Sequence, residues 1–422
     1  MKKLLFLAAA AATVFASCAK TDIVQKNTGQ GDAINFGVYV PKAVTKAGAS
    51  GTITVDGTGG TTTSLQTTGF GVFAYYSNGA TYAHPATTPN FMYNEQVSGA
   101  SWTYSPLKYW PNETINDNNG ATGPAAADVL SFFAYAPWVG AGDNNAFSGS
   151  TTEGIVGLTA NTATTDPKVS YKVSGDPSKA VDLLWAVAPA GGFSYTDVHG
   201  ASVSVSEGMP LMNLTKPNTT TKVPFHFRHA TARLNLKVVG AYDQVAVGGT
   251  LDADTKVTVE SVVLDVPSYL TGDLNLNNTT VGANKPYWEN LSGSAGTLTV
   301  DGDKLNTAIK YGETGANVGS DAANMQDVMA SNTFFTLIPK DGSQAVTVTI
   351  TYYVTTTDAA LNGGKSEVQN VITKTVTFAD GFVAGKSYTI AMVLGLTSVK
   401  FLATVEDWDS LSPSYVDLPI NH

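Results

Sequence analysis

The stretch QAVTVTITYYVTT, residues 344–356, shows the pattern that recurs through most of this chain. Val346, Val348 and Ile350 alternate with threonines, which places apolar side chains on one face of an extended strand. Because no long segment has helical spacing of apolar residues, the sequence predicts an all-β protein. Comparable strand-like stretches occur at residues 69–76, 101–111, 129–138, 182–189, 223–239, 255–267, 333–340, 371–378, 386–396 and 399–408.

The length of the chain favours two domains. A single hydrophobic core stops growing near ~250–300 residues, and this chain has 422. The polar stretch NLTKPNTTTK ends at Lys222 and reads as a linker. We therefore expect an N-terminal β-sandwich over residues 47–221 and a C-terminal β-sandwich over residues 222–422, where the predicted strands suit a seven-stranded sandwich.

The N-terminus, MKKLLFLAAAAATVFASCAK, has the features of a bacterial secretion signal: two lysines, an apolar run and small residues before a cysteine. The position of Cys18 resembles that of the acylated cysteine in a lipoprotein signal. A simple secretory cut nearby is the alternative. We expect residues 1–18 to be the signal and Cys18 the lipidation site. No later apolar run is long enough for a second membrane span, so the lipid would be the only membrane attachment.

Both ends of the mature chain carry an isolated alternating strand. In AINFGVYVPKAVTKAG, residues 33–48, the apolar residues are Ile34, Phe36, Val38 and Val40. Lys46 follows, flanked by small residues, and a trypsin-like protease could cut the bond from Lys46 to Ala47. Residues 19–46 then form a tether and a removable strand. At the other end, three apolar residues alternate again: Val416, Leu418 and Ile420.

Composition and motifs argue against several classes of function. The formal net charge of −10 disfavours nucleic acid and anionic lipid surfaces as partners. The single cysteine excludes internal disulfides and thiol metal clusters. His226 and His229 are three apart in a predicted strand and would face opposite sides, so we predict no metal site. DGFVAGKS, residues 380–387, lacks the spacing of a phosphate loop and reads as a turn before a strand. We expect no enzyme and no cofactor.

Four aromatic residues allow two interpretations. Trp102, Tyr104, Tyr109 and Trp110 could form a platform on which sugars stack. They could equally belong to strands whose aromatic side chains lie in the core of a sandwich, and this interpretation is favoured. A surface lipoprotein that binds glycans remains an alternative function.

Six stretches in order resemble one family. GFGVFAYY, SWTYSPLKYWP, LSFFAYAPW, DLLWAVAP, FHFRHATARLNLKV and a terminal VEDW, behind a lipoprotein-like signal, are similar to the fimbrillin family of Bacteroidales, the FimA/Mfa-like subunits of type V pili. The resemblance covers about Ile34 to Trp408. It implies two transthyretin-like β-sandwich domains in tandem, exported as a lipidated precursor to the outer membrane and then built into an extracellular fimbrium that serves adhesion.

The resemblance also implies an assembly route. A trypsin-like surface protease would cut at Lys46–Ala47 and remove the lipid with the strand from Ile34 to Val40. The vacated groove would accept Val416, Leu418 and Ile420 from a neighbouring subunit. Well-known members are cut after arginine, whereas this chain has Lys46, with Lys42 as a competing site.

The expected partners are other copies of the chain, related pilus subunits, the maturation protease, and ligands on host or bacterial surfaces. An anchor or tip subunit is the alternative within the family. An anchor should keep its lipid and escape the cut, whereas a tip should lack a usable donor strand.

Overall fold

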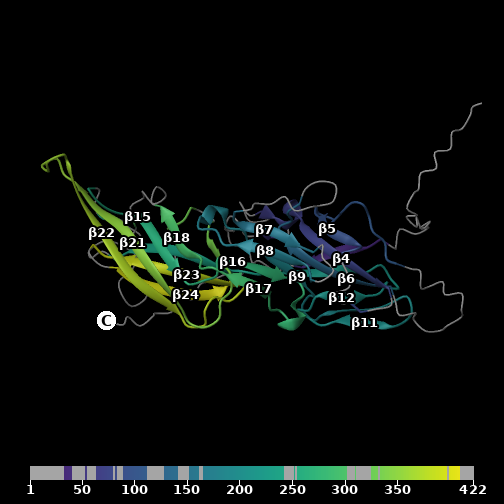
Figure 1. Cartoon of the computed structure of the whole chain (residues 1–422). Coiled ribbons are helices and arrows are strands. Elements are labelled where there is room, and N and C mark those ends of the chain that lie inside the picture. Colours follow the sequence, from purple (N-terminus) through teal and green to yellow (C-terminus); the bar gives the residue numbers. More distant parts are fainter. Residues whose placement is uncertain are drawn as a thin grey trace, which may run out of the picture.

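The computed structural model describes residues 33–39, 53–54, 63–78, 81–82, 89–111, 128–140, 152–160, 165–241, 251, 254–301, 309, 325–330, 333–396 and 399–408. The molecule is elongated and its regular structure is almost entirely β-strand, as Figure 1 shows. This confirms the predicted all-β fold. No helix in the described residues is long and apolar enough to cross a bilayer.

The first sheet occupies one end of the molecule and has seven strands. These are β1 (Asn35–Tyr39), β4 (Phe70–Asn78), β5 (Met92–Val97), β6 (Asp128–Ala136), β9 (Leu184–Val187), β12 (Leu211–Leu214) and β13 (Lys222–His229). Their order is β1-β13-β9-β6-β4-β5, and β12 pairs with β6. Every pairing is antiparallel except that of β1 with β13, which is parallel. Strand β1 is therefore an edge strand, and it runs in the same direction as the strand it pairs with.

The second sheet joins segments that are far apart in the sequence. It contains β7 (Gly154–Thr159), β8 (Lys168–Lys172), β16 (Thr271–Asn275) and β17 (Tyr287–Ser292). Their order is β17-β16-β8-β7, so β8 and β16 form the central pair, with Val169 opposite Leu274. Strands from both sides of the expected boundary at residues 221 and 222 thus share one sheet. Strand β13, which begins at Lys222, lies in the first sheet.

Two further sheets form the other end of the molecule. One contains β14 (Ala232–Gly240), β19 (Gln326–Asp327), β20 (Phe335–Leu337), β23 (Lys386–Leu394) and β24 (Val399–Asp407). The other has the order β18-β15-β21-β22, from β15 (Thr255–Val266), β18 (Gly296–Asp301), β21 (Gln344–Thr357) and β22 (Lys365–Phe378). The hairpin of β21 and β22 projects beyond the body in Figure 1.

Small elements complete the described chain. Strands β2 (Ile53–Thr54) and β3 (Thr63–Ser64) pair, and so do β10 (Phe193–Thr196) and β11 (Ser202–Val205). A single-turn helix, α1 (Leu65–Thr68), precedes β4, and two 3-10 turns lie at Pro177–Lys179 and Asn278–Thr280.

The cores follow from the alternation of apolar residues along the strands. On β4, Phe70 and Val72 face one apolar cluster, whereas Phe73 and Tyr75 face another. The first cluster covers one face of the first sheet. The second runs from the opposite face of that sheet, past β8 and β16, into the space between the two C-terminal sheets. The two ends of the molecule therefore share a continuous core.

Most of the expected strands are confirmed, and one is wrong. Residues 223–239 divide into β13 and β14 because the chain leaves the first sheet at Ala230 and Thr231. Residues 101–111, by contrast, form turns and isolated bridges, and Trp102 has a positive φ of 54°. Pro106 and Pro111 cannot donate ladder hydrogen bonds, which explains why an aromatic-rich stretch here is not a strand.

Candidate strand-binding groove

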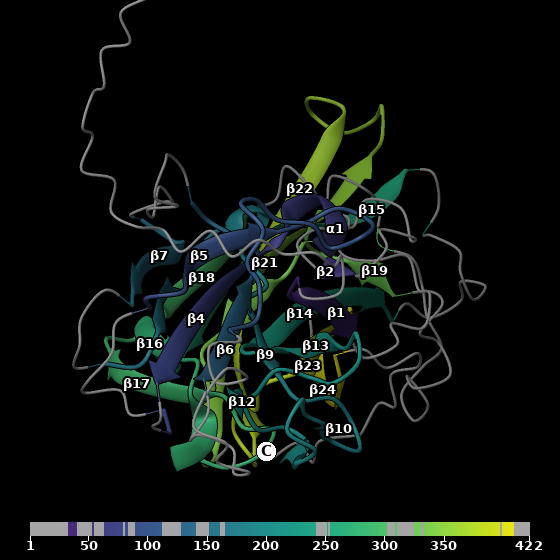
Figure 2. The same ribbon diagram turned by 90° about the vertical axis from the view of Figure 1, so that its right-hand side faces the viewer.

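Strand β1 lies at the free edge of β13, as the end-on view in Figure 2 shows. The register pairs Phe36 with Val223 and Val38 with Phe225. Among the described residues, no strand pairs with the outer edge of β1. The N-terminal strand is thus held through one neighbouring strand and through what its side chains contact.

Alternation along β1 explains how the strand is held. Ile34 and Phe36 are buried, at 0% and 1% exposure, and Val38 is half-buried against the same cluster. Burying an isoleucine and a phenylalanine contributes about 1.5–3 kcal/mol each. These side chains sit in the space that we call the β1 groove, lined by β13, β6, β4 and residues 104–110.

Phe36 fills an aromatic pocket at the centre of the β1 groove. Its ring stacks on Phe225, with centroids 5.4 Å apart and planes inclined by 16°. Tyr104 lies at 5.4 Å, Phe132 at 6.0 Å and Phe70 at 6.3 Å, in tilted or edge-on arrangements. Such contacts add about 0.5–1.5 kcal/mol per pair beyond burial. Phe36 is therefore the main apolar anchor of β1.

Residues 104–109 cover the start of β1. The backbone N–H of Ile34 donates to the Lys108 carbonyl at 2.9 Å, and Ala33 forms an antiparallel bridge with Tyr109. The Tyr104 hydroxyl donates to the Ile34 carbonyl at 2.9 Å and accepts from the Lys108 N–H at 3.2 Å. Burial raises the pKa of Tyr104 to about 12. The hydroxyl therefore remains a donor at neutral pH.

The four aromatic residues that could form a sugar platform lie in different environments. Tyr104 and Trp110 are 8% and 5% exposed and belong to the core cluster of the β1 groove. Trp102 packs on Phe70, and Tyr109 is 45% exposed. The core interpretation therefore holds for Tyr104 and Trp110.

The structure brings together only part of the expected site. Ile34, Phe36 and Val38 lie in the groove. The remaining residues lie outside the described ranges, namely Cys18, Val40, Lys42, Lys46, Ala47, Val416, Leu418 and Ile420.

A buried cluster where β13 ends marks the point at which the described chain stops. His229 Nδ1 lies 2.8 Å from Asp182 Oδ1, and both residues are buried. The ring of Trp408 stacks on His229, with centroids 4.1 Å apart and planes inclined by 2°, and Phe334 packs edge-on against Trp408. The backbone N–H of Trp408 donates to the Gly385 carbonyl at 2.8 Å. We call Asp182, His229, Phe334 and Trp408 the junction cluster.

Sequence reasoning missed this cluster. The spacing of His226 and His229 predicts only that they face opposite sides of a strand, and in the structure His226 is half-buried whereas His229 is buried. Asp182 lies 47 residues before His229, so no local spacing reveals their pairing. The tryptophan of VEDW was the one usable signal in the sequence, because a tryptophan side chain at the end of a strand is usually buried against other side chains.

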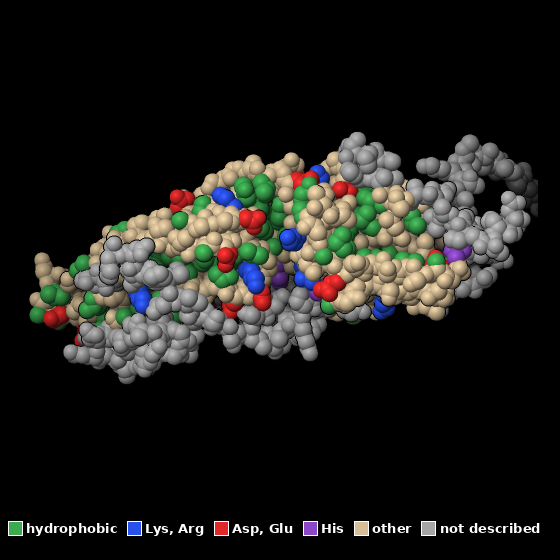
Figure 3. Space-filling view, turned by 90° about the horizontal axis from the view of Figure 1, so that it is seen from below, with side chains coloured by type: hydrophobic (Ala, Val, Ile, Leu, Met, Phe, Trp, Pro, Cys, Tyr) green, Lys and Arg blue, Asp and Glu red, His purple; other side chains and the backbone are tan. Residues whose placement is uncertain are grey.

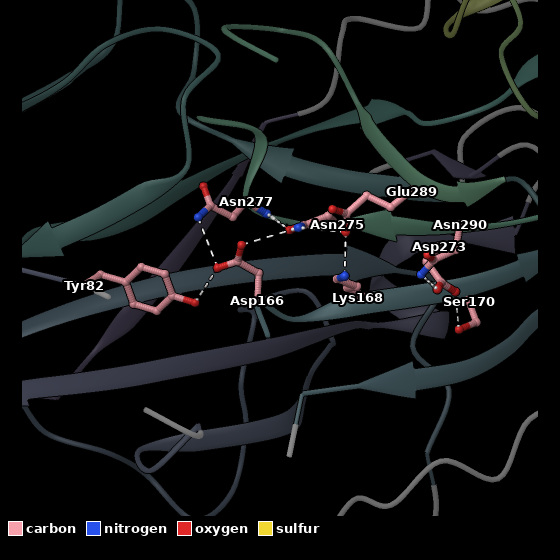
Figure 4. A network of polar contacts seen from close by, with 9 residues as sticks. All are labelled: Tyr82, Asp166, Lys168, Ser170, Asp273, Asn275, Asn277, Glu289 and Asn290. Atoms are coloured by element: carbon pink, nitrogen blue, oxygen red, sulfur yellow. Dashed lines mark hydrogen bonds and ion pairs between the residues drawn. The ribbon is translucent and has the colours of Figure 1, made fainter. Parts of the chain in front are cut away.

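A polar network ties the second sheet together and joins it to the first, as Figure 4 shows. Asp166 accepts hydrogen bonds from the Tyr82 hydroxyl at 2.9 Å and from the side-chain amides of Asn277 and Asn275, at 3.2 and 3.4 Å. Tyr82 also packs edge-on against Tyr75 of β4. Burial, with nearby charge, raises the pKa of Tyr82, which stays protonated as a donor.

A second part of the network lies along β8, β16 and β17. Lys168 forms an ion pair with Glu289 at 2.6 Å, and Asp273 accepts from Ser170 at 2.6 Å and from Asn290 at 2.7 Å. Partial burial alone would raise the pKa of Glu289. The hydrogen bonds from Lys168 and its other neighbours outweigh that effect and hold the pKa below its usual value. The network therefore fastens the two halves of the chain to each other.

The surface carries charges of both signs. On the face seen in Figure 3, lysine and arginine side chains are interspersed with aspartate and glutamate, and neither sign forms a continuous patch. Among the described residues, no three His, Cys, Asp or Glu side chains are grouped as metal ligands would be.

Comparison with known proteins finds a relative that is similar over nearly the whole chain and a solved structure that shares the fold. No protein-family model matches the chain. It is 25% identical to the fimbrium subunit Fim1C of Phocaeicola vulgatus, over 94% of this chain and 93% of that protein. A crystal structure of a fimbrial protein from Bacteroides vulgatus has 22% sequence identity and a TM-score of 0.56, over 89% of this chain and 99% of that one. The match to the fimbrium subunit agrees with the resemblance of the six ordered stretches of sequence to the fimbrillin family, and the chain is similar to that subunit over nearly its whole length.

Proposed function

We propose that this protein is a structural subunit of a fimbria that polymerises when β1 is replaced by a strand from another subunit. The observation that carries the proposal is the β1 groove. An edge strand near the N-terminus fills an aromatic pocket, and its removal would leave an apolar trough beside the free backbone edge of β13. A strand is the ligand that matches such a trough, because it supplies both backbone hydrogen bonds and alternating side chains.

Strand β1 then acts as a temporary plug. While it is in place, the precursor has no open edge at β13 and stays monomeric. Cleavage between Lys46 and Ala47 by a trypsin-like protease would release residues 19–46, including Ile34, Phe36, Val38 and Val40. After the cut, β1 is no longer covalently linked to the rest of the chain. Its backbone pairing with β13 covers only about five residues, so the strand can dissociate.

The incoming strand is the C-terminal segment with Val416, Leu418 and Ile420. These residues alternate as Ile34, Phe36 and Val38 do, so they can fill the same positions along β13. The first sheet lies at one end of the molecule and β24 in the other half (Figure 1). A contact between unlike ends is head-to-tail and grows into a fibre unless it closes into a ring.

Export and attachment complete the route. Cys18 would carry the lipid of an outer-membrane precursor, and cleavage would free the mature subunit for the extracellular fimbrium. Related subunits would be the partners in the filament, which would present adhesive surfaces to host or bacterial ligands. The role is mechanical, so activity would be measured as assembly and adhesion.

Limited trypsin digestion tests the proposal. A precursor beginning at Ala19 is digested, the new N-terminus is sequenced, and the products are viewed by electron microscopy. We expect Ala47 as the new N-terminus, dissociation of residues 19–46 and the appearance of filaments. Lys46→Gln is the test variant, and Lys42→Gln is the matched control that should still assemble. A cut precursor that retains β1 and stays monomeric at every concentration would refute the proposal.

A further inference from the structure

We propose that β22 is an interaction surface for a second copy of this chain, and that the β22 strands of two copies pair antiparallel about a two-fold axis. Among the described residues, β22 pairs on one side only, with β21, and the contact uses its free edge. This strand lies toward the opposite end of the molecule from the β1 groove (Figure 1). The contact needs neither cleavage nor exchange of a strand, so the inference goes beyond the proposed function.

Strand β22 is long and its side chains are exposed. It has fourteen residues, and those from Lys365 to Gln369 are exposed on both faces of the strand. The hairpin of β21 and β22 projects from the body in Figure 1 and again in the end-on view of Figure 2. The free edge of β22 is thus accessible to the same edge of another molecule.

The middle of β22 lacks the features that keep an edge strand from pairing. Residues 368–373, VQNVIT, contain no charge, no proline and no glycine, and most of them are β-branched. Val371 and Val368 are 60% and 56% exposed, more than any other large apolar residue in the described part of the chain. An uncharged segment of this kind on an exposed edge is a template for another strand. Charges stand only at its flanks, at Glu367 and Lys374.

The sequence of β22 is complementary to itself, which identifies the partner as a second copy. If Asn370 lies opposite Asn370 of the other copy, Val368 lies opposite Ile372 at two symmetric places. These side chains share the face on which Val376 and Phe378 are buried. Ile372 already packs against the core cluster, so Val368 of the other copy extends an apolar contact that exists in each molecule.

The charges of β22 are compatible with this register. Each charged residue then lies opposite a serine or a threonine: Lys365 opposite Thr375, Glu367 opposite Thr373, and Lys374 opposite Ser366. No two like charges face each other, which would be unfavourable in a cross-strand pair. Moving one strand by two residues in either direction removes both pairs of valine with isoleucine. One register is therefore preferred.

A two-fold contact of this kind is closed. Both copies use the same edge, so none is left for a third, and pairing gives a dimer and not an open sheet. The contact covers residues 365–375 of each copy, roughly half of what a standard interface uses, so an isolated pair should be weak. If subunits are joined in a row, as in the proposed fimbria, many such contacts act together. Strand β22 would then hold two filaments side by side.

Trapping of a mixed disulfide tests the register. A precursor beginning at Ala19 has no cysteine. Val368→Cys and Ile372→Cys are made as separate proteins, because each position lies opposite the other and about 14 Å from its own symmetry mate. The two are mixed at high concentration, oxidised and analysed on a non-reducing gel. Val368→Cys mixed with Ser366→Cys is the matched control, because these positions share a face but lie about 20 Å apart in the dimer.

We expect a disulfide-linked dimer from the mixture of Val368→Cys with Ile372→Cys. Each variant alone and the control mixture should stay at background. Equal yields from every mixture would show that the cysteines meet by random collision, and would overturn the proposed pairing. Background yield from the test mixture would overturn it as well. Because the uncut precursor is used, neither outcome depends on whether β1 is released.

Charge substitutions at Thr373 provide a second measurement. This exposed residue faces Glu367 of the other copy, so Thr373→Glu creates two like-charge pairs and Thr373→Lys two opposite-charge pairs. Sedimentation velocity over a concentration series should give dissociation constants at least about tenfold apart, with the lysine variant tighter. Thr377→Glu and Thr377→Lys lie beyond the paired residues and show the effect of net charge alone. A difference no larger than that of the Thr377 variants would overturn the proposal.

Discussion

Replacing Phe36 with alanine should loosen β1 without disrupting the rest of the molecule. Phe36 is 1% exposed and contacts four aromatic rings, so its truncation should cost about 3–5 kcal/mol. That loss is comparable to the whole free energy that the buried side chains of β1 contribute, at about 1.5–3 kcal/mol each. The variant should therefore hold β1 only weakly.

Hydrogen exchange followed by mass spectrometry measures this effect locally. Exchange in residues 33–39 should speed up by about two to three orders of magnitude, because each 1.4 kcal/mol changes an opening equilibrium about tenfold. Exchange along the outer edge of β13 should rise as well, whereas the strands of the C-terminal sheets should keep their protection. The free energy of global unfolding should fall by no more than the stabilisation that the contacts of β1 contribute.

Two variants serve as controls for this experiment. Val38→Ala removes a half-buried side chain from the same strand and should have a smaller effect, about 1 kcal/mol. Phe73→Ala lies on the opposite face of the first sheet and should lower global stability without selectively exposing β1. If Phe36→Ala leaves the exchange of residues 33–39 unchanged, or exposes all strands equally, β1 is an integral part of the sheet and the plug is refuted.

Three further predictions concern the groove and the scaffold around it. Tyr104→Phe removes the hydrogen bond to the Ile34 carbonyl, so β1 should dissociate faster after the cut by a factor that corresponds to about 0.5–1.5 kcal/mol; a fluorescence label on residues 19–46 reports the rate, and an unchanged rate would contradict this role. Asp182→Ala leaves His229 without its buried partner and should lower the free energy of unfolding in urea by about 3–5 kcal/mol, whereas a loss below 1 kcal/mol would show that the pair is dispensable. The folded-state pKa of Glu289 is lowered, so this group adds stability above its usual pKa of 4.5 that is lost as pH falls through the folded value. Glu289→Gln should therefore flatten the acid limb of the stability curve, and identical limbs for both proteins would contradict it.

The sequence predicts strands well where apolar and polar residues alternate, because burial of one face requires that period. Residues 344–356 and 386–396 became β21 and β23 for this reason. The pairing of strands is set by contacts between distant segments, which local periodicity does not encode. The adjacency of β8 and β16, and with it a sheet shared by both halves, could therefore not be predicted.

The candidate site shows the same division. Alternation identified Ile34 and Phe36 as core residues, and both are buried. The aromatic composition of residues 101–111 suggested a strand, but the prolines in this segment prevent regular strand pairing. The segment instead packs over β1, and its Tyr104 and Trp110 belong to the same apolar cluster as Phe36. The junction cluster depends on Asp182, His229 and Trp408, which come from three separated parts of the chain.

The occupant of the β13 edge in an assembled filament tests the central claim most directly. Electron cryomicroscopy of filaments grown from cut precursor would resolve which residues pair with Lys222–His229. The account predicts that residues 33–39 are absent and that Val416, Leu418 and Ile420 of a neighbouring subunit fill the positions of Ile34, Phe36 and Val38. Filaments in which residues 33–39 still pair with β13 would contradict it.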